Sequence, residues 1–263
     1  MEEGKLKEIF NLMYKKLTEL AVDDRFKLWI ERLRNNDFEK NKEKGDNFFF
    51  EKLAVTIFVS GFKSKIFDEK WPYIKKAFNN FDVAKISKYD EEKINEIINT
   101  PNIIKNKAKI KAVINNAKKY VEIKQKYGSF TNYIESFKNP LELAQNLIKN
   151  FQFIGSTNVW DYLKSISIDA VKPDIHVRRI LHRLGLINSD KPSPETIKQV
   201  FQIVQKISKA TGEKLSIIDA VIWFYGAERP EIKKPICGKT PQCNECPLTK
   251  HCKYYQTKRI KHH

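Results

Sequence analysis

Apolar residues recur every three or four positions along most of this 263-residue chain. That spacing gathers them on one face of a helix, whereas a half-buried strand needs strict alternation. Glycine occurs 9 times and proline 10 times, and no Asn-Gly or Asp-Gly pair joins two alternating runs, so β-hairpins are not indicated. We therefore predict an all-α protein of roughly ten or more helices. The clearest helical runs are residues 46–67, 91–98, 107–121, 141–151 and 197–210.

Two polar stretches separate some of these runs. Residues 35–46 are mostly polar, which predicts a loop between the charged N-terminal helices and the first long run. At residues 191–194, the sequence Lys-Pro-Ser-Pro predicts a turn, and Ser193 is placed to cap the helix that follows.

The chain is strongly basic, with a formal net charge of +17, and the excess is uneven. Residues 171–263 hold 18 Lys and Arg against 8 Asp and Glu. A basic surface concentrated in one part of a protein favours a polyanionic partner, above all nucleic acid, although a lysine-rich proteome is the simpler alternative. No apolar stretch is long enough to span a membrane, and residues 1–16 lack the apolar core of a signal peptide. We expect a cytoplasmic, nucleoid-associated protein.

The four cysteines all lie in the last 27 residues, spaced C-x5-C-x2-C-x5-C: Cys237, Cys243, Cys246 and Cys252. Disulfides are rare in the reducing cytoplasm. Structural zinc is a second alternative, because four thiolates suit tetrahedral Zn²⁺, but zinc ribbons usually pair two tight C-x2-C knuckles. One tight pair with a looser cysteine on each side favours a 4Fe-4S cluster.

Residues 171–186 predict a short helix. Pro173 precedes it, Gly185 ends it, and Asp174 stands at its first turn, where a carboxylate caps a helix. Taken alone, Asp174 is most simply interpreted as such a cap.

The cysteine segment resembles the C-terminal cluster loop of the endonuclease III and adenine-mismatch glycosylase families. The shared features are an apolar helix ending in Gly226 before the first cysteine, and Pro247 directly after the third. The first cysteine gap is one residue shorter here than is usual in those families. The resemblance implies a 4Fe-4S cluster on the four cysteines, and a loop that turns Lys239 and Lys250 toward the DNA backbone; ordinary solvated lysines are the alternative.

Asp174, His176, Val177 and Arg179 match the D-x-H-V-x-R signature of the helix-hairpin-helix DNA glycosylases. This resemblance implies that Asp174 is the catalytic carboxylate, which stabilises an oxocarbenium-like sugar or activates the attacking water. Arg178 and Arg179 are then candidates to pair with DNA phosphates, or with carboxylates of the protein core.

Residues 151–160, Phe-Gln-Phe-Ile-Gly-Ser-Thr-Asn-Val-Trp, resemble the hairpin of the bacterial type I 3-methyladenine DNA glycosylases. Backbone N–H groups of Gly155, Ser156 and Thr157 would then face a DNA phosphate, while a plain helix–helix turn is the alternative. The likeness continues upstream in residues 49–53, 61–62, 77–82 and 103–117. That family recognises its base with a Glu where this chain has Thr56, so narrow 3-methyladenine specificity does not carry over.

Together these resemblances imply two helical subdomains that flank a DNA-binding cleft. Residues 46–164 would form a helical barrel with the helix-hairpin-helix, and residues 1–45 with 165–263 the half that holds the cluster. Such enzymes extrude the target nucleotide into a pocket. Candidate pocket residues, for each of which core packing is the alternative, are Thr56, Phe58, Phe62, Trp160 and Trp223.

Bifunctional relatives carry a Schiff-base lysine in the helix after the hairpin, and residues 156–162 contain no lysine. The expectation is therefore a monomeric, monofunctional glycosylase that acts on double-stranded DNA containing a damaged base, with alkylated purines favoured by the barrel likeness. The alternatives are a non-catalytic lesion-binding protein of the same fold, a bifunctional glycosylase and lyase, and an unrelated zinc-containing nucleic-acid-binding module.

Overall fold

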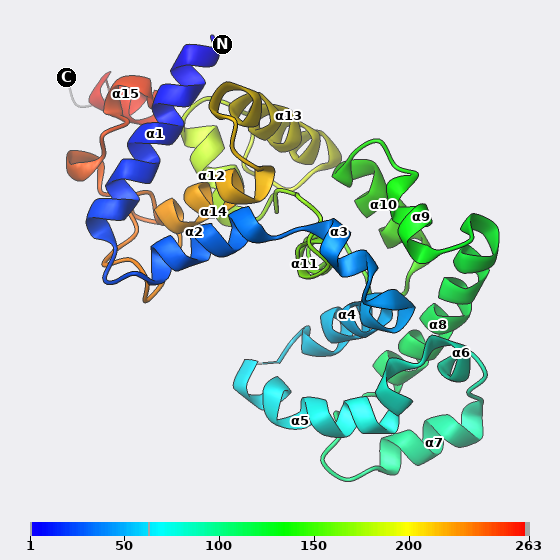
Figure 1. Ribbon diagram of the computed structural model, residues 1–263. Helices are drawn as coiled ribbons and strands as arrows, with labels where there is room; N and C mark the ends of the chain where they lie inside the picture. Colours follow the sequence, from blue (N-terminus) through cyan, green and yellow to red (C-terminus); the bar gives the residue numbers. More distant parts are fainter. Residues whose placement is uncertain (1, 63, 261–263) are drawn as a thin grey trace. The chain divides into compact units, whose positions relative to one another are not determined.

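The computed structural model describes residues 2–62 and 64–260, which are helical and contain no β-strand (Figure 1). The prediction of an all-α protein is thereby confirmed. The chain divides into two units: unit 1 comprises Met1–Asn36 with Asp169–His263, and unit 2 comprises Asp37–Ile168. The sequence places these boundaries nearby, at residues 45/46 and 164/165. None of the helices in the described part of the chain is both long and apolar enough to cross a membrane.

Unit 2 is built around α8 (Lys107–Tyr127), which packs against α4 (Gly45–Val59), α6 (Val83–Ile86), α7 (Glu91–Asn99) and α9 (Phe130–Glu135). Its core is rich in aromatic rings: Tyr120 stacks on Phe130 with ring centroids 4.1 Å apart, and Phe50 meets Tyr120 edge-on. The other helical elements of unit 2 are α3 (Phe38–Lys42), α5 (Ser64–Ala77), η1 (Asn79–Phe81), α10 (Pro140–Asn150) and α11 (Val159–Ser165).

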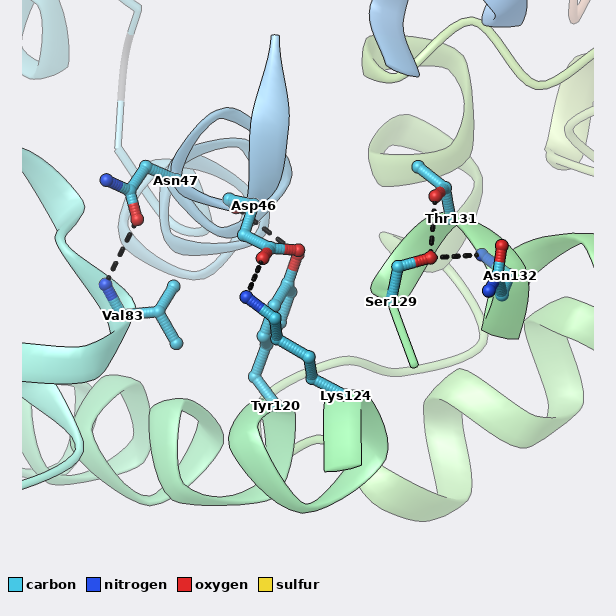
Figure 2. A network of polar contacts seen from close by, with 8 residues as sticks. All are labelled: Asp46, Asn47, Val83, Tyr120, Lys124, Ser129, Thr131 and Asn132. Carbon is cyan, nitrogen blue, oxygen red and sulfur yellow. Dashed lines mark hydrogen bonds and ion pairs between the residues drawn. The ribbon is translucent and has the colours of Figure 1, made fainter. Parts of the chain in front are cut away.

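A polar network at the start of α4 ties that helix to α8 (Figure 2). The Tyr120 hydroxyl donates to Asp46 Oδ1 at 3.1 Å, and Lys124 Nζ lies 2.5 Å from Asp46 Oδ2. Next to it, Asn47 Oδ1 accepts from the backbone N–H of Val83. A carboxylate in the first turn of a helix also interacts favourably with the helix dipole. Asp46 therefore stabilises the first turn of α4 and links it to α8, the longest helix of the unit.

Replacing Tyr120 with Phe should lower the free energy of unfolding by about 1 kcal/mol, because the ring packing stays and one buried hydroxyl bond is lost. Urea titration followed by circular dichroism measures this. Tyr127→Phe is the matched control: within the described residues the Tyr127 hydroxyl makes no hydrogen bond, so the stability of this variant should stay at the wild-type value. Equal stability of the two variants would show that the Asp46–Tyr120 bond contributes nothing.

Two local predictions for unit 2 are wrong. Residues 38–42 are not a loop but the short helix α3, because Asp37 caps it by accepting from the Glu39 N–H. The run 46–67 is not continuous: α4 ends at Val59, and Gly61 adopts a positive φ of 83° that stops the helix before α5 begins.

Unit 1 surrounds α14 (Leu215–Gly226), ten of whose twelve residues are buried. A helix that is apolar on all sides belongs at the centre of a bundle. It packs against α1 (Glu3–Leu20), α2 (Arg25–Asn35), α12 (Ile175–Arg183) and α13 (Pro194–Thr211). The last segment carries η2 (Cys243–Glu245), η3 (Thr249–His251) and α15 (Lys253–Ile260). Ser193 caps α13 as predicted, since its Oγ accepts from Thr196 N at 3.0 Å.

Candidate active site and cysteine cluster

Asp174 is the N-cap of α12. Its Oδ1 accepts hydrogen bonds from the backbone N–H groups of His176 at 2.8 Å and Val177 at 3.0 Å. Within the described residues, its other carboxylate oxygen, Oδ2, accepts no hydrogen bond, and the side chain is half-buried. One oxygen thus holds the carboxylate in place at the positive end of a helix, while the other is open to a ligand.

The start of α12 is bound to the end of α14. His176 Nδ1 and Arg179 Nη2 both lie within hydrogen-bond distance of the Gly226 carbonyl, at 3.0 and 3.1 Å. Among the described residues, Arg179 Nε is buried with no hydrogen-bond partner, and burial lowers the pKa of this guanidinium. In this structure Arg179 makes contacts inside unit 1, and its contact with a DNA phosphate stays a prediction. Arg178 also bonds backbone oxygens, donating to Asp190 O at 2.8 Å and to Pro173 O.

Gly226 lies where α14, α12 and the cysteine segment meet. A Cβ at this position would stand 2.7 Å from Ile180 Cδ1 and 3.3 Å from the Cys237 carbonyl oxygen. The Ile180 methyl can move, but the Cys237 backbone must shift to make room. A side chain at residue 226 would therefore displace the Ile180 methyl and press against the Cys237 backbone.

Gly226→Ala should lower the free energy of unfolding by about 1–3 kcal/mol, the usual cost of overpacking a closely packed site. Gly4→Ala is the matched control, because a Cβ on Gly4 meets nothing within 4 Å and residue 4 is helical. Thermal unfolding of both variants measures the difference. Wild-type stability of Gly226→Ala would contradict the close approach.

The segment before Asp174 is held by two carboxylates that the sequence did not single out. Asp169 accepts from Leu215 N at 3.0 Å and Ser216 N at 2.8 Å, and so caps α14 from a distant part of the chain. Asp219, inside α14, accepts from Lys172 N at 2.9 Å through Oδ1. The available signal was that Asp219 is the one charged residue within the apolar run 215–226.

Within the described residues none of the four cysteines forms a disulfide, and all four line one small hollow that is partly open to solvent. Arg183 from α12 holds the first part of this segment: it donates to Gly238 O at 2.7 Å and lies 3.4 Å from Cys237 Sγ. Tyr225 Oη lies 3.2 Å from Cys246 Sγ. Burial raises the pKa of the Cys237 thiol, and the bond from Arg183 acts against that rise.

The arrangement of the four cysteines bears on whether they can bind a metal ion or cluster. Across residues 2–62 and 64–260, no three or more His, Cys, Asp or Glu side chains are close enough together to bind one metal ion directly. All four cysteines nevertheless line a common hollow, and two of them have a hydrogen-bonding group of the protein beside the sulfur. Polar contacts to the sulfurs are a usual feature of thiolate-bound clusters. In the described part of the chain, the four cysteines thus share one hollow without the close grouping of side chains that binds a metal ion directly.

The hairpin of residues 151–158 is organised by a side chain that sequence reasoning missed. Asn158 Oδ1 accepts from Gly155 N at 2.7 Å, and Asn158 Nδ2 donates to Phe153 O at 2.9 Å. Ser156 and Thr157 are exposed, and in the described part of the chain their backbone N–H groups make no hydrogen bond. Phe153 is 49% exposed and has a positive φ of 60°.

The candidate pocket residues fall into two groups. Thr56, Phe58 and Trp160 are at most 4% exposed and lie in the core, where the Thr56 hydroxyl donates to Lys52 O. These three side chains are thus packed as the core-packing alternative predicts, and a contact of any of them with a base stays a prediction. Phe62 is 38% exposed and Trp223 is half-buried. Trp223 is the better placed of the two, because its ring lies edge-on to His176, at 6.3 Å, beside the Asp174 cap.

Comparison with known proteins agrees with this architecture. Residues 37–150, all in unit 2, match the family model of the methyladenine glycosylases. DNA-3-methyladenine glycosylase 1 of Escherichia coli is 32% identical over 63 residues, which are 24% of this chain and 34% of that protein. The DNA-3-methyladenine glycosylase of Haemophilus influenzae is 26% identical over 140 residues, covering 45% of this chain and 76% of that protein. The chain thus spans about a third of the first relative's length and about three quarters of the second's.

Structural similarity to known proteins extends beyond unit 2 into unit 1. The crystal structure of the 8-oxoguanine DNA glycosylase of Thermotoga maritima aligns with a TM-score of 0.53 and 18% identity, and covers 83% of this chain and 96% of that chain. The chain has the fold of the helical DNA glycosylases. Since unit 2 is only half of the sequence, this glycosylase fold includes residues of unit 1, where Asp174 and the cysteines lie.

Proposed function

We propose that this protein is a monofunctional DNA glycosylase that removes a damaged base, with alkylated purines as the favoured substrates, in base-excision repair. The observation that carries this proposal is the Asp174 carboxylate, fixed through one oxygen at the start of α12 with the other oxygen open, in a chain of glycosylase fold. A fold alone does not establish activity, and this placed carboxylate supplies the chemistry.

The proposed reaction is hydrolysis of the bond between C1′ of the deoxyribose and a base nitrogen. The electron pair of that bond leaves with the base, and positive charge builds up on the sugar. The Asp174 carboxylate stabilises this charge electrostatically. Water adds to C1′ and passes its proton to the carboxylate, so the products are the free base and an abasic site.

Alkylated purines suit a site of this kind. Methylation of a purine ring nitrogen gives the base a positive charge, so it departs as a neutral molecule and needs no proton from the protein. The match of unit 2 to the methyladenine glycosylase family supports the same substrate class.

The proposed lack of lyase activity rests on the residues after the hairpin. A lyase needs an amine that attacks C1′ and forms a Schiff base. Residues 156–162, which include the first half of α11, contain no lysine.

We further propose that Cys237, Cys243, Cys246 and Cys252 hold a 4Fe-4S cluster. When bound, such a cluster would cross-link residues 237–252 through four iron–sulfur bonds. The exposed side chains of Lys239 and Lys250 lie on this segment. Together with the free N–H groups of Ser156 and Thr157, they are the groups proposed to contact the phosphates of double-stranded DNA. We also propose a monomer that works in the cytoplasm at the nucleoid.

The experiment is base release from duplexes that each carry one lesion, including a methylated purine, followed by hot alkali. Strand breaks that appear only after alkali support monofunctional excision. Breaks without alkali would show lyase activity and overturn the monofunctional assignment. Tight binding to the same duplexes with no excision on any of them would replace the enzyme with a lesion-binding protein of the same fold.

A further inference from the structure

Helix α14 contains one charged side chain, Asp219, within the sequence Leu-Ser-Ile-Ile-Asp-Ala-Val-Ile-Trp-Phe-Tyr-Gly. Asp219 is 4% exposed and lies in the core of unit 1. A carboxylate in such surroundings is costly unless hydrogen bonds satisfy it. Its presence in the most buried helix of the unit therefore calls for a bond that an apolar residue could not make.

One such bond joins Asp219 to the segment that leads into α12. Asp219 Oδ1 accepts from the backbone N–H of Lys172 at 2.9 Å. Three residues earlier in the chain, Asp169 accepts from the N–H groups of Leu215 and Ser216 at the start of α14. Ala170 and Val171, between the two anchors, are fully buried. Residues 169–172 are thus bound to α14 at both ends.

Asp174 follows this anchored segment directly. Its own N–H donates to Lys172 O at 2.8 Å, so Lys172, whose N–H is held by Asp219, also accepts the N–H of Asp174 through its carbonyl. On the other side, His176 Nδ1 lies 3.0 Å from Gly226 O at the end of α14. The carboxylate therefore stands between two attachments to one rigid helix, one of them two residues before it and one two residues after it.

We propose that Asp219 is a positioning residue for Asp174: by holding the Lys172 peptide on α14, it sets where the Asp174 carboxylate stands at the start of α12. This inference rests on the proposed function of Asp174. Asp219 itself is only 4% exposed within unit 1, so the role proposed for it is exerted through Lys172.

Such positioning matters because the rate of catalysis by a fixed charge depends strongly on the position of that charge relative to the reacting atoms. A displacement of about 1 Å by a remote substitution can cost on the order of 10²-fold in rate. Without the Asp219 acceptor, the Lys172 N–H is left unsatisfied in the core, and residues 172–174 must shift to find another partner. DNA affinity depends on groups elsewhere and should not change.

The test compares Asp219→Ala with Asp219→Asn under single-turnover conditions, with enzyme in excess over dimethyl-sulfate-methylated DNA. We expect Asp219→Ala to release methylated purines on the order of 10²-fold more slowly, with unchanged DNA affinity. Asp219→Asn keeps an oxygen that can accept from Lys172 N, so its rate should return close to that of the wild type. An Asn variant as slow as the Ala variant would overturn the hydrogen-bond assignment.

Val204→Ala distinguishes a loss of positioning from a general loss of stability. It removes two buried methyl groups from α13 of the same unit. We expect its melting temperature to fall as far as that of Asp219→Ala while its excision rate stays at the wild-type value. If Val204→Ala slows excision equally, Asp219 acts only through global stability and the proposal fails.

Hydrogen exchange of the Lys172 amide gives a readout that does not depend on activity. We expect protection in the wild type and in Asp219→Asn, and loss of protection in Asp219→Ala. An unprotected Lys172 amide in the wild type would overturn the positioning role. A protected amide in a wild type that excises no base would instead remove the proposed function while leaving the anchoring of residues 169–174 in place.

Discussion

Asp174→Asn is expected to lower the single-turnover rate of base release by about 10²–10⁴-fold, since it removes the charge that would stabilise the transition state or accept the proton of water. The substitution keeps the shape of the side chain. The amide oxygen of Asn can still accept from His176 N and Val177 N, so α12 should keep its cap and the variant should stay folded. Release of methylated purines from methylated DNA measures the loss, and a duplex-binding assay should give an affinity close to that of the wild type.

The matched control for this variant is Asp190→Asn, which removes the same charge from an exposed position in unit 1. Its excision rate should equal that of the wild type. If Asp174→Asn excised at the wild-type rate, the role of the α12 carboxylate would be disproved, and another group would have to supply the chemistry.

Cys246→Ala is expected to abolish the broad visible absorption near ~400 nm that a 4Fe-4S protein shows, together with its bound iron. Because the free energy of metal binding also stabilises the fold around the site, stability should fall by several kcal/mol. For a chain of this size that corresponds to roughly 10 °C in melting temperature, at ~2–4 °C per kcal/mol. The effect should be concentrated in residues 237–252, which carry all four cysteines.

Thr249→Ala is the control for the cysteine variant, because Thr249 lines the same hollow without offering a thiol. It should keep both colour and iron. A colourless wild-type protein that contains stoichiometric zinc would contradict the iron–sulfur assignment and favour a structural zinc site, since four thiolates also suit Zn²⁺.

The two predictions test different parts of unit 1. Asp174 is the N-cap directly before α12, and Arg183, the last residue of that helix, contacts the cysteine segment. A nine-residue helix spans about 13 Å, at roughly 1.5 Å per residue, so the carboxylate and the cysteines are connected through one rigid element. Loss of the cluster should therefore also slow base release, by less than loss of Asp174.

Local signals in the sequence were sufficient to predict the structural elements whose ends depend on a few neighbouring residues. Asp174 after Pro173 and before Gly185 predicts where α12 begins and ends, because a cap, a fixed φ and a left-handed glycine each act within one turn. Ser193 as the cap of α13 follows for the same reason. The crowding of four cysteines into one segment likewise predicts, from the sequence alone, that they share one site.

Contacts between residues far apart in the chain were decided only by the tertiary structure. The bond between Asp219 and Lys172 joins residues 47 positions apart, and no local pattern specifies it. The short helix α3 was missed because its support, such as the bond from Asn41 to Ser167, comes from across unit 2. The surroundings of Thr56 and Phe58 were likewise decided by the tertiary structure: a helical stripe shows that a face is buried, and packing of the whole unit determines whether that face meets a ligand or the core.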